Sequence, residues 1–265
     1  MHTFNSRIRS NQKGFTLIEL LVVIAIIALL MGILMPALSR VKSMARAAAC
    51  QSNLHQWAVM WSMYADDNDG SFHPGRGGTT YTADDRWPTV LRYYYKDDDI
   101  RLCPMATKPS TDGGQNPFCA WGRFDDGMYA SYGINEWLLN RPVGSDSYSD
   151  NYWRKLYNIK LSSNVPLFLD CRWYDVWAFS IDEPPPYDGA DLTIGGKNEM
   201  WRVCLNRHNY AVNSAFLDWT VRKVNLKQLW TLKWHKNYNT KDMWTTAGGA
   251  VDTDWPEWMR GLKAY

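Results

Sequence analysis

A histidine and an aspartate in the last third of the sequence are the residue types best suited to chemistry. Arg207-His208 is followed after nine residues by Asp218, and a histidine with a carboxylate could begin a catalytic or metal site. A hydrolase triad lacks support, because there is no G-x-S-x-G and no cysteine set near a matching histidine in a known motif. We therefore interpret His208 and Asp218 as structural, with the histidine at a strand end, hydrogen-bonded near a hairpin turn and holding the loop between them. No residue set supports an enzyme.

The cysteines are the second set of residues with chemical potential. There are five, at positions 50, 103, 119, 171 and 204, with no CxxC pair and no Cys/His spacing typical of zinc. In an exported protein disulfides are permitted. Cys103 and Cys119 flank one loop, and Cys171 and Cys204 lie in separate strand-like segments, so these four are the disulfide candidates. Because five is odd, at least one thiol is free or pairs between chains, and the connectivity stays open.

A lone carboxylate, Glu19, lies in an apolar stretch that is long enough to cross a membrane. The segment 15–35 is 21 residues long and carries no other charge. This is about the length of a transmembrane helix. Residues 1–14 carry three cations and no acid, so the positive-inside rule keeps them in the cytoplasm and exports the rest. A plain membrane anchor would explain the length but not Glu19. A carboxylate in the bilayer costs a few kcal/mol and normally marks a function with a partner.

The residues around Glu19 resemble a known processing signal. Lys13-Gly14-Phe15-Thr16-Leu17-Ile18-Glu19-Leu20, with the apolar run that continues to Ala28, is similar to the prepilin signature of type IV pilins and type II secretion pseudopilins. The resemblance implies that a dedicated membrane peptidase cuts between Gly14 and Phe15 and N-methylates Phe15. It also implies a helical homopolymer, built from the membrane by an inner-membrane assembly platform.

After such a cut, Phe15 would carry an ammonium one helical turn from Glu19. A neighbouring subunit, shifted along the axis, could present its Phe15 ammonium to this Glu19. Each charge is costly alone in an apolar environment, so the pair would set register more than stability. Pro36 removes a helical hydrogen bond, and Gly32 lowers helix preference. We expect residues 32–36 to be kinked in the monomer and partly extended in the filament. The alternative is a simple bend at the point where the helix leaves the membrane.

Apolar spacing predicts one long helix followed by a loop-rich, strand-containing part. Helical periodicity continues over residues 37–66, with an apolar stripe that begins at Leu54, and Gly70 follows the last periodic residue. The expected organisation is a leader over 1–14, a helical region over 15–70 and a β-rich head over 71–265. Within the head we expect strands over 165–170, 173–179, 201–205, 214–217 and 220–224, and a short helix over 226–235.

The fold class that follows is α+β, with a helical spine packed on an antiparallel sheet with long loops, as in pilins. The strands over 201–205, 214–217 and 220–224 are expected to join in that sheet. The hairpin turn contains Trp219, where a two-residue turn with positive φ would favour glycine, so we expect another turn type or a longer turn.

A second resemblance covers most of the chain. His208, nine residues and Asp218 resemble the H-X9-DG signature of prepilin-type proteins, with Trp219 in place of the glycine. The supporting pieces are Cys50-Gln-Ser-Asn-Leu-His-Gln, Cys103-Pro104, Ser131-Tyr-Gly-Ile-Asn135 and Phe216-Leu-Asp218. No activity of the head follows from this resemblance. Pseudopilins often hold calcium in a loop near the C-terminus, which makes Asp242, Asp252, Asp254 and Glu257 the candidate ligands here.

Charge and composition narrow the function class. The net charge of +2, with no basic stripe, does not indicate a nucleic-acid binder. Loss of residues 1–14 would change 29 cations against 27 acids to 26 against 27. Fifteen Trp and fifteen Tyr favour core and interface packing over a ligand platform. We expect a pilus subunit, first in the inner membrane and then in an extracellular filament. The alternatives are a pseudopilin in a periplasmic pseudopilus and a membrane-anchored carbohydrate-binding or adhesion module with a line of exposed Trp rings.

Overall fold

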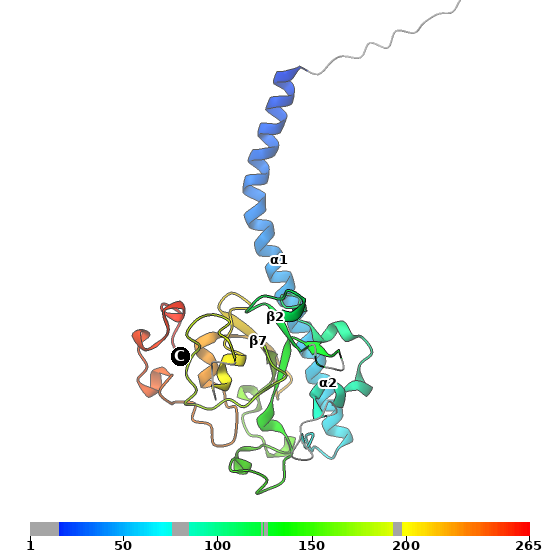
Figure 1. The fold of residues 1–265 in the computed structure, drawn as a ribbon, viewed down its shortest axis with the longest axis vertical. Coiled ribbons are helices and arrows are strands. Elements are labelled where there is room, and N and C mark those ends of the chain that lie inside the picture. Colours follow the sequence, from blue (N-terminus) through cyan, green and yellow to red (C-terminus); the bar gives the residue numbers. More distant parts are fainter. Residues whose placement is uncertain (1–15, 76–84, 123, 125–126, 193–197) are drawn as a thin grey trace, which may run out of the picture. The chain divides into compact units, whose positions relative to one another are not determined.

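The structure is a computed structural model that describes residues 16–75, 85–122, 124, 127–192 and 198–265. The chain divides into two compact units, Met1–Met44 and Ala45–Tyr265. We call the second the head unit. Figure 1 shows its short strands and loops.

The α-helix α1 (Leu17–Asp67) has two halves of different character. Up to residue 46 the described side chains are exposed, and fifteen large apolar ones lie between Leu17 and Met35. In the head unit, α1 buries the stripe predicted from Leu54 onward, which confirms the predicted apolar face: its members are Leu54, Trp57, Ala58, Trp61 and Ala65. The helix ends where Gly70 takes a positive φ of 71° and its N–H donates to the carbonyl of Ala65, a common way to close a helix.

Five strands form the main sheet of the head unit in the order β6-β4-β5-β7-β8. Their bounds are β4 (Tyr132–Asn135), β5 (Pro166–Asp170), β6 (Asp175–Val176), β7 (Ala211–Phe216) and β8 (Val221–Asn225). Neighbours are antiparallel except for β4 and β6, which pair in parallel. Strands β5 and β7 are buried along their whole length, as central strands covered on both faces are. The predicted α+β architecture with a mainly antiparallel sheet is confirmed.

A second, smaller sheet and many single-turn helices complete the head unit. The sheet has the order β1-β2-β3, with β1 (Lys108–Pro109), β2 (Cys119–Gly122) and β3 (Tyr129–Ala130). The short α-helix α2 covers Trp87–Val90. The described 3-10 helices are Arg92–Tyr94, Asp98–Arg101, Ser110–Asp112, Glu136–Leu138, Ser149–Asn151, Leu156–Asn158, Ser162–Asn164, Glu199–Arg202, Leu226–Thr231, Thr246–Gly248, Asp252–Asp254 and Glu257–Met259.

The predicted strand over 201–205 is wrong. Glu199–Arg202 is a 3-10 helix, and the Cys204 N–H donates to the carbonyl of Met200. The inner neighbour of β7 is β5. The reason is that a short, wholly buried apolar run does not reveal by periodicity whether it is a strand, a helix or a loop.

Two other predicted elements are shorter than expected. Of the strand over 173–179 only β6 forms. The helix over 226–235 is a 3-10 helix that ends at Thr231, because Leu232 is extended. The predicted apolar face of this helix is confirmed, since Leu226, Leu229 and Trp230 are buried.

The predicted hairpin is confirmed as β7–β8, with the predicted longer turn. The Phe216 N–H donates to the Thr220 carbonyl and the Trp219 N–H to the Phe216 carbonyl, so the loop holds Leu217, Asp218 and Trp219. Trp219 has a φ of 68°. In three-residue hairpin loops the last residue takes this left-handed conformation. Trp219 therefore occupies a conformation that favours glycine and costs other residues about 1–2 kcal/mol.

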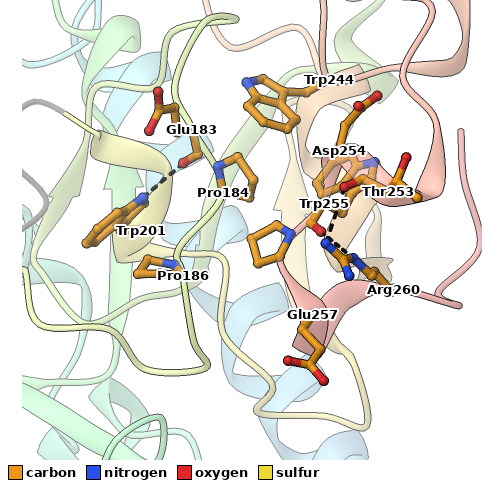
Figure 2. Close-up of a pocket in the computed structure, with 11 residues that line it drawn as sticks. Glu183, Pro184, Pro186, Trp201, Trp244, Thr253, Asp254, Trp255, Glu257 and Arg260 are labelled. Carbon is orange, nitrogen blue, oxygen red and sulfur yellow. Dashed lines mark hydrogen bonds between the residues drawn. The ribbon is translucent and has the colours of Figure 1, made fainter.

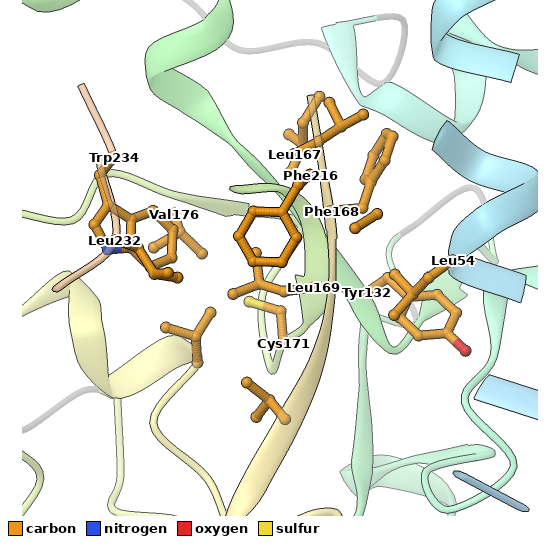
Figure 3. Packing of buried hydrophobic residues seen from close by; sticks show 14 of the residues in the cluster. Leu54, Tyr132, Leu167, Phe168, Leu169, Cys171, Val176, Phe216, Leu232 and Trp234 are labelled. Carbon is orange, nitrogen blue, oxygen red and sulfur yellow. The ribbon is translucent and has the colours of Figure 1, made fainter. Parts of the chain in front are cut away.

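The core lies on both faces of β5. Phe168 packs against Trp61 and Trp87 on the face covered by α1, with ring centroids 5.7 and 4.9 Å apart. Figure 3 shows Leu54 and Tyr132 to one side of this strand and Val176 and Trp234 to the other. Alternate residues of a strand point to opposite faces, so β5 supplies side chains to both layers.

All fifteen Trp lie in the described part of the chain, and none of them is exposed. Ten are buried and five are half-buried. This confirms the expectation that the aromatic excess serves packing. The line of exposed Trp rings expected of a carbohydrate-binding module is not formed.

Candidate functional site

The start of α1 is held by a reciprocal pair of hydrogen bonds between Thr16 and Glu19. The Thr16 N–H and hydroxyl both donate to Glu19 Oε2, at 2.9 and 2.8 Å, and the Glu19 N–H donates to Thr16 Oγ1 at 3.3 Å. This is a capping box, in which the two side chains satisfy amides that have no partner within the helix. Glu19 therefore has a local partner in the single chain. This partner was not predicted, although Thr16-x-x-Glu19 is a capping-box motif.

The helix residues that follow are apolar and unburied. α1 is the one helix of the described residues that is long and apolar enough to cross a membrane, and the most apolar window of it is 0% buried. Full burial of a Leu, Ile or Val side chain is worth about 1.5–3 kcal/mol. Fifteen large apolar side chains between Leu17 and Met35 therefore amount to tens of kcal/mol, on the order of 20 or more. Such a surface requires lipid or other helices around it.

Gly32 and Pro36 lie inside α1, which is helical throughout this segment. Proline has no N–H, so the carbonyl of Gly32, four residues earlier, has no helical donor. A side chain added at Gly32 would meet nothing within 4 Å. Extension of this segment in an assembled filament stays a prediction. The predicted cleavage site between Gly14 and Phe15 lies outside the described residues.

In the head unit, His208 pairs with a residue that was not predicted. His208 Nε2 is 3.1 Å from Asp170 Oδ2, at the end of β5. Asp218 lies in the hairpin turn and accepts hydrogen bonds from Thr220. The predicted arrangement of His208 and Asp218 is therefore wrong. The missed partner lies far from His208 in the sequence, and only the pairing of β5 with β7 brings the two together.

Asp170 is a buried carboxylate with three neighbours that stabilise its charge. Besides His208, Arg207 Nη1 lies 3.2 Å from Oδ1, and the Asn213 N–H donates to Oδ2 at 2.8 Å. Arg207 is itself buried and donates to the carbonyls of Ser131 and Cys119. Burial alone would raise the pKa of Asp170, but the two cations and the N–H outweigh it and lower the pKa to about 2. Burial lowers the pKa of His208, but Asp170 outweighs this effect and raises it to about 9.

Two cysteines complete this group. Cys50 Sγ lies 3.6 Å from Asp170 Oδ1, and Cys103 Sγ lies 3.4 Å from His208 Nε2. The ligand atoms of Cys50, Cys103, Asp170 and His208 all lie within 4.8 Å of one another, and the four residues are buried. We call these four residues the Cys-Asp-His cluster. They come from α1, a loop, the end of β5 and the segment before β7, so no local Cys/His spacing in the sequence could reveal them.

The predicted disulfides are not formed. All five cysteines, each in the described part of the chain, are free thiols. Cys119 donates to Asn116 Oδ1, Cys171 accepts from the Trp173 N–H, and Cys204 contacts the sulfur of Met259. The candidate pairs lie in different surroundings, which their spacing along the chain did not indicate.

The four predicted calcium ligands each have a protein partner or face solvent. Ser180 donates to Asp242, Lys227 pairs with Asp252 at 2.7 Å, and Asp254 accepts from the Val251 N–H. Glu257 is exposed. Among the described residues, the Cys-Asp-His cluster is the only group of three or more ligand side chains at metal-binding distance. Calcium stays a prediction.

Asp254 and Glu257 line an open groove of about 580 Å³ in the head unit, shown in Figure 2. Two hydrogen bonds connect residues that line the groove: Trp201 Nε1 donates to the Glu183 carbonyl, and Arg260 Nε donates to the Trp255 carbonyl. Trp201 and Trp255 present little surface, since both are buried. The groove is therefore bounded by prolines and carboxylates as much as by aromatic rings.

Comparison with known proteins agrees with the N-terminal features. The prokaryotic N-terminal methylation motif matches residues 9–35. The type IV wide pilus major component PilA4 of Thermus thermophilus is 44% identical over 59 residues, which are 22% of this chain and 45% of that protein. The match thus spans less than half of that relative. No solved structure matches the chain.

The matched region contains the basic leader, the Gly-Phe step, Glu19 and the apolar part of α1. These are the same features that resemble the prepilin signature. Together with the long helix and the β-rich head unit, these features make the chain similar to type IV pilins.

Proposed function

We propose that this chain is the structural subunit of an extracellular type IV pilus-like filament, assembled through its N-terminal helix. The observation that carries the proposal is the match of residues 9–35 to the N-terminal methylation motif, joined to a helix whose apolar side chains are unburied in the single chain. A membrane covers these side chains before assembly, and helices of neighbouring copies cover them afterwards.

The route to the filament follows from this proposal. The precursor lies in the inner membrane, a prepilin peptidase removes residues 1–14, and an assembly platform moves the mature chain into the growing filament. The N-terminal helix of the chain contacts lipid first and other copies of the same chain afterwards. Nothing in this route requires catalysis by the chain.

Glu19 is the residue that would set the register of the assembly. In the single chain its carboxylate caps α1 through Thr16. In the filament the carboxylate would pair with the Phe15 ammonium of a neighbouring copy. The hydrogen bonds from Thr16 leave the negative charge of Glu19 in place, whereas an ammonium would neutralise it, so the exchange of partners favours assembly where water is excluded.

The main alternative is a pseudopilin in a periplasmic pseudopilus, which would use the same leader, Glu19 and helix. The two differ in where the polymer lies. Electron microscopy of sheared cell-surface material, with mass spectrometry of its subunits, separates them. Long fibres of this chain that begin with methylated Phe15 support the pilus, whereas the absence of surface fibres together with a secretion defect supports the pseudopilus.

A charge-specific test uses Glu19→Gln, with Thr16→Ala as the matched control. The glutamine retains an oxygen that can accept from Thr16 but carries no charge. Thr16→Ala removes the capping hydroxyl, at about 1 kcal/mol, and keeps the carboxylate. We expect Glu19→Gln to reduce surface filaments at least tenfold while the membrane level of the chain stays normal, and Thr16→Ala to assemble.

Normal filaments from Glu19→Gln would show that the charge is not needed for register. Loss of filaments from both variants would assign the role of Glu19 to capping the helix. A subunit that begins at unmodified Met1 and lies singly in the membrane would overturn assembly altogether.

A further inference from the structure

The Cys-Asp-His cluster has the donors and the spacing of a metal site. It offers two sulfurs, one imidazole nitrogen and one carboxylate, all buried and within 4.8 Å of one another. We propose that Cys50, Cys103, Asp170 and His208 bind one divalent metal ion, with Zn²⁺ as the ion that their chemistry favours.

The distances agree with tetrahedral coordination. Zn–S, Zn–N and Zn–O bond lengths place neighbouring ligand atoms about 3.4–3.8 Å apart on the edges of a tetrahedron. Cys103 Sγ is 3.4 Å from His208 Nε2, and Asp170 Oδ2 is 3.7 Å from Cys50 Sγ and 3.1 Å from His208 Nε2. The other ligand atoms lie within 4.8 Å of one another, so shifts of up to about 1 Å would complete the tetrahedron.

The surrounding residues orient the ligands as outer partners do in metal sites. The Asn213 N–H donates to Asp170 Oδ2, and Arg207 holds Oδ1 while donating to the carbonyl of Ser131. The Cys103 N–H donates to the hydroxyl of Ser131. The carboxylate and one thiol are thus fixed by the same buried network.

The charges also balance around a divalent ion. As a ligand His208 is neutral, because the ion replaces its proton. Two thiolates and one carboxylate then carry three negative charges, and the ion together with the buried Arg207 guanidinium supplies three positive ones. Buried charge is tolerated when it is paired in this way. Sulfur and imidazole ligands favour Zn²⁺ over Ca²⁺ or Mg²⁺.

The site would be structural. Four protein donors fill a tetrahedral shell and leave no position for substrate. The ion would fasten Cys50 of α1 to the end of β5 at Asp170 and to the segment that leads into β7. It would also keep two thiols reduced after export. The alternative state to test is a Cys50–Cys103 disulfide, in which His208 would have no metal to bind.

The test uses the full chain, purified from membranes in detergent with a tag that binds no metal. Metal is counted by inductively coupled plasma mass spectrometry. We expect about one zinc per chain in the unmodified protein and in the control Cys119→Ser, which alters a buried thiol outside the cluster. We expect at least a tenfold lower content in the Cys50→Ser/Cys103→Ser double variant.

A second measurement avoids variants that fail to fold. The unmodified chain is stripped by a chelator and reloaded with Co²⁺, which should produce a thiolate-to-cobalt charge-transfer band. Alkylation followed by peptide mapping should show Cys50 and Cys103 protected by Zn²⁺ and exposed by the chelator, with Cys119 unchanged by either.

Three results would overturn the proposal. The first is background metal content with no cobalt band. The second is an intact mass lower by two hydrogens with a linked Cys50–Cys103 peptide, which would identify a disulfide. The third is full metal content in the double variant, which would place the metal elsewhere.

Discussion

Two buried aspartates of the head unit differ in their partners, and the difference sets their pKa values. Asp170 faces Arg207 and His208, and its pKa is lowered to about 2. Among the described residues, the N–H groups of Phe179 and Met200 donate to Asp182 Oδ2. Burial outweighs these two hydrogen bonds and raises the pKa of Asp182 to about 7. Neutral donors therefore compensate less than cations for the loss of water around a carboxylate.

Asp182 should make the head unit less stable as the pH rises from about 4 to about 7. In that range the folded chain keeps a proton on Asp182 that the unfolded chain has lost. The free energy of unfolding therefore falls as the pH rises. The loss has an upper limit of roughly 4 kcal/mol at neutral pH, from about 1.4 kcal/mol per pKa unit. Asp182→Asn, which cannot ionise, should remove this part of the slope and raise stability at pH 8.

Urea unfolding of the detergent-solubilised chain between pH 4.5 and 8 would measure this. Asp150→Asn changes an exposed carboxylate and should leave the slope as it is. If Asp182→Asn has the same slope as the unmodified chain, the raised pKa of Asp182 is wrong.

At the scale of elements, α1 and the β7–β8 hairpin show two ways in which tertiary packing modifies what the local sequence favours. In α1 the same helix changes from an exposed apolar surface to a buried stripe, because only the second half has a sheet to pack on. In the hairpin, strand pairing between Ala211–Phe216 and Val221–Asn225 forces the three-residue turn. Trp219 then takes a left-handed conformation that its own preference opposes.

Substitutions at Trp219 should separate this backbone strain from side-chain packing. Trp219→Ala loses the half-buried ring and retains the strain, whereas Trp219→Gly loses the ring and relieves the strain. We expect the glycine variant to be more stable than the alanine variant by about 1 kcal/mol. Thermal or urea unfolding of the two proteins measures the difference. Equal stability, or a more stable alanine variant, would contradict the left-handed conformation.

At the scale of the molecule, the two compact units have separate requirements. The described core clusters around residues from Cys50 onward, so the head unit can bury its apolar surface without the first half of α1. The N-terminal unit has an apolar surface that is unburied among the residues that the structure describes. Folding and assembly are therefore distinct steps, and processing at Gly14 should affect only the second.

Gly14→Val tests this separation. A bulky residue before the cut should block processing, so the chain should stay in the membrane with a mass larger by residues 1–14 and form no filaments. The unfolding transition of the head unit should not change. Gln12→Val, also in the leader, is the control and should be processed. Intact-mass analysis and urea unfolding measure both effects, and a blocked precursor with a destabilised head unit would contradict the separation.

Local sequence patterns allowed the main features of residues 1–70 to be predicted. The processing motif, the apolar length, the stripe from Leu54 and the end of the helix near Gly70 depend on residues that are close in the chain. Helical periodicity and a single charge among apolar residues act over a few turns, so sequence alone reveals them. The strand at 165–170 and the β7–β8 hairpin could be predicted for the same reason.

Tertiary structure alone decided the chemistry of the head unit. His208 was expected to act with Asp218, and Cys103 was a candidate for a disulfide. Sheet pairing and the packing of α1 instead brought both to Asp170 and Cys50, which are themselves 120 residues apart in the sequence. Such contacts depend on how whole elements pack, and no local spacing encodes them. The residues with most chemical potential were visible in the sequence, but which of them meet was set by the fold.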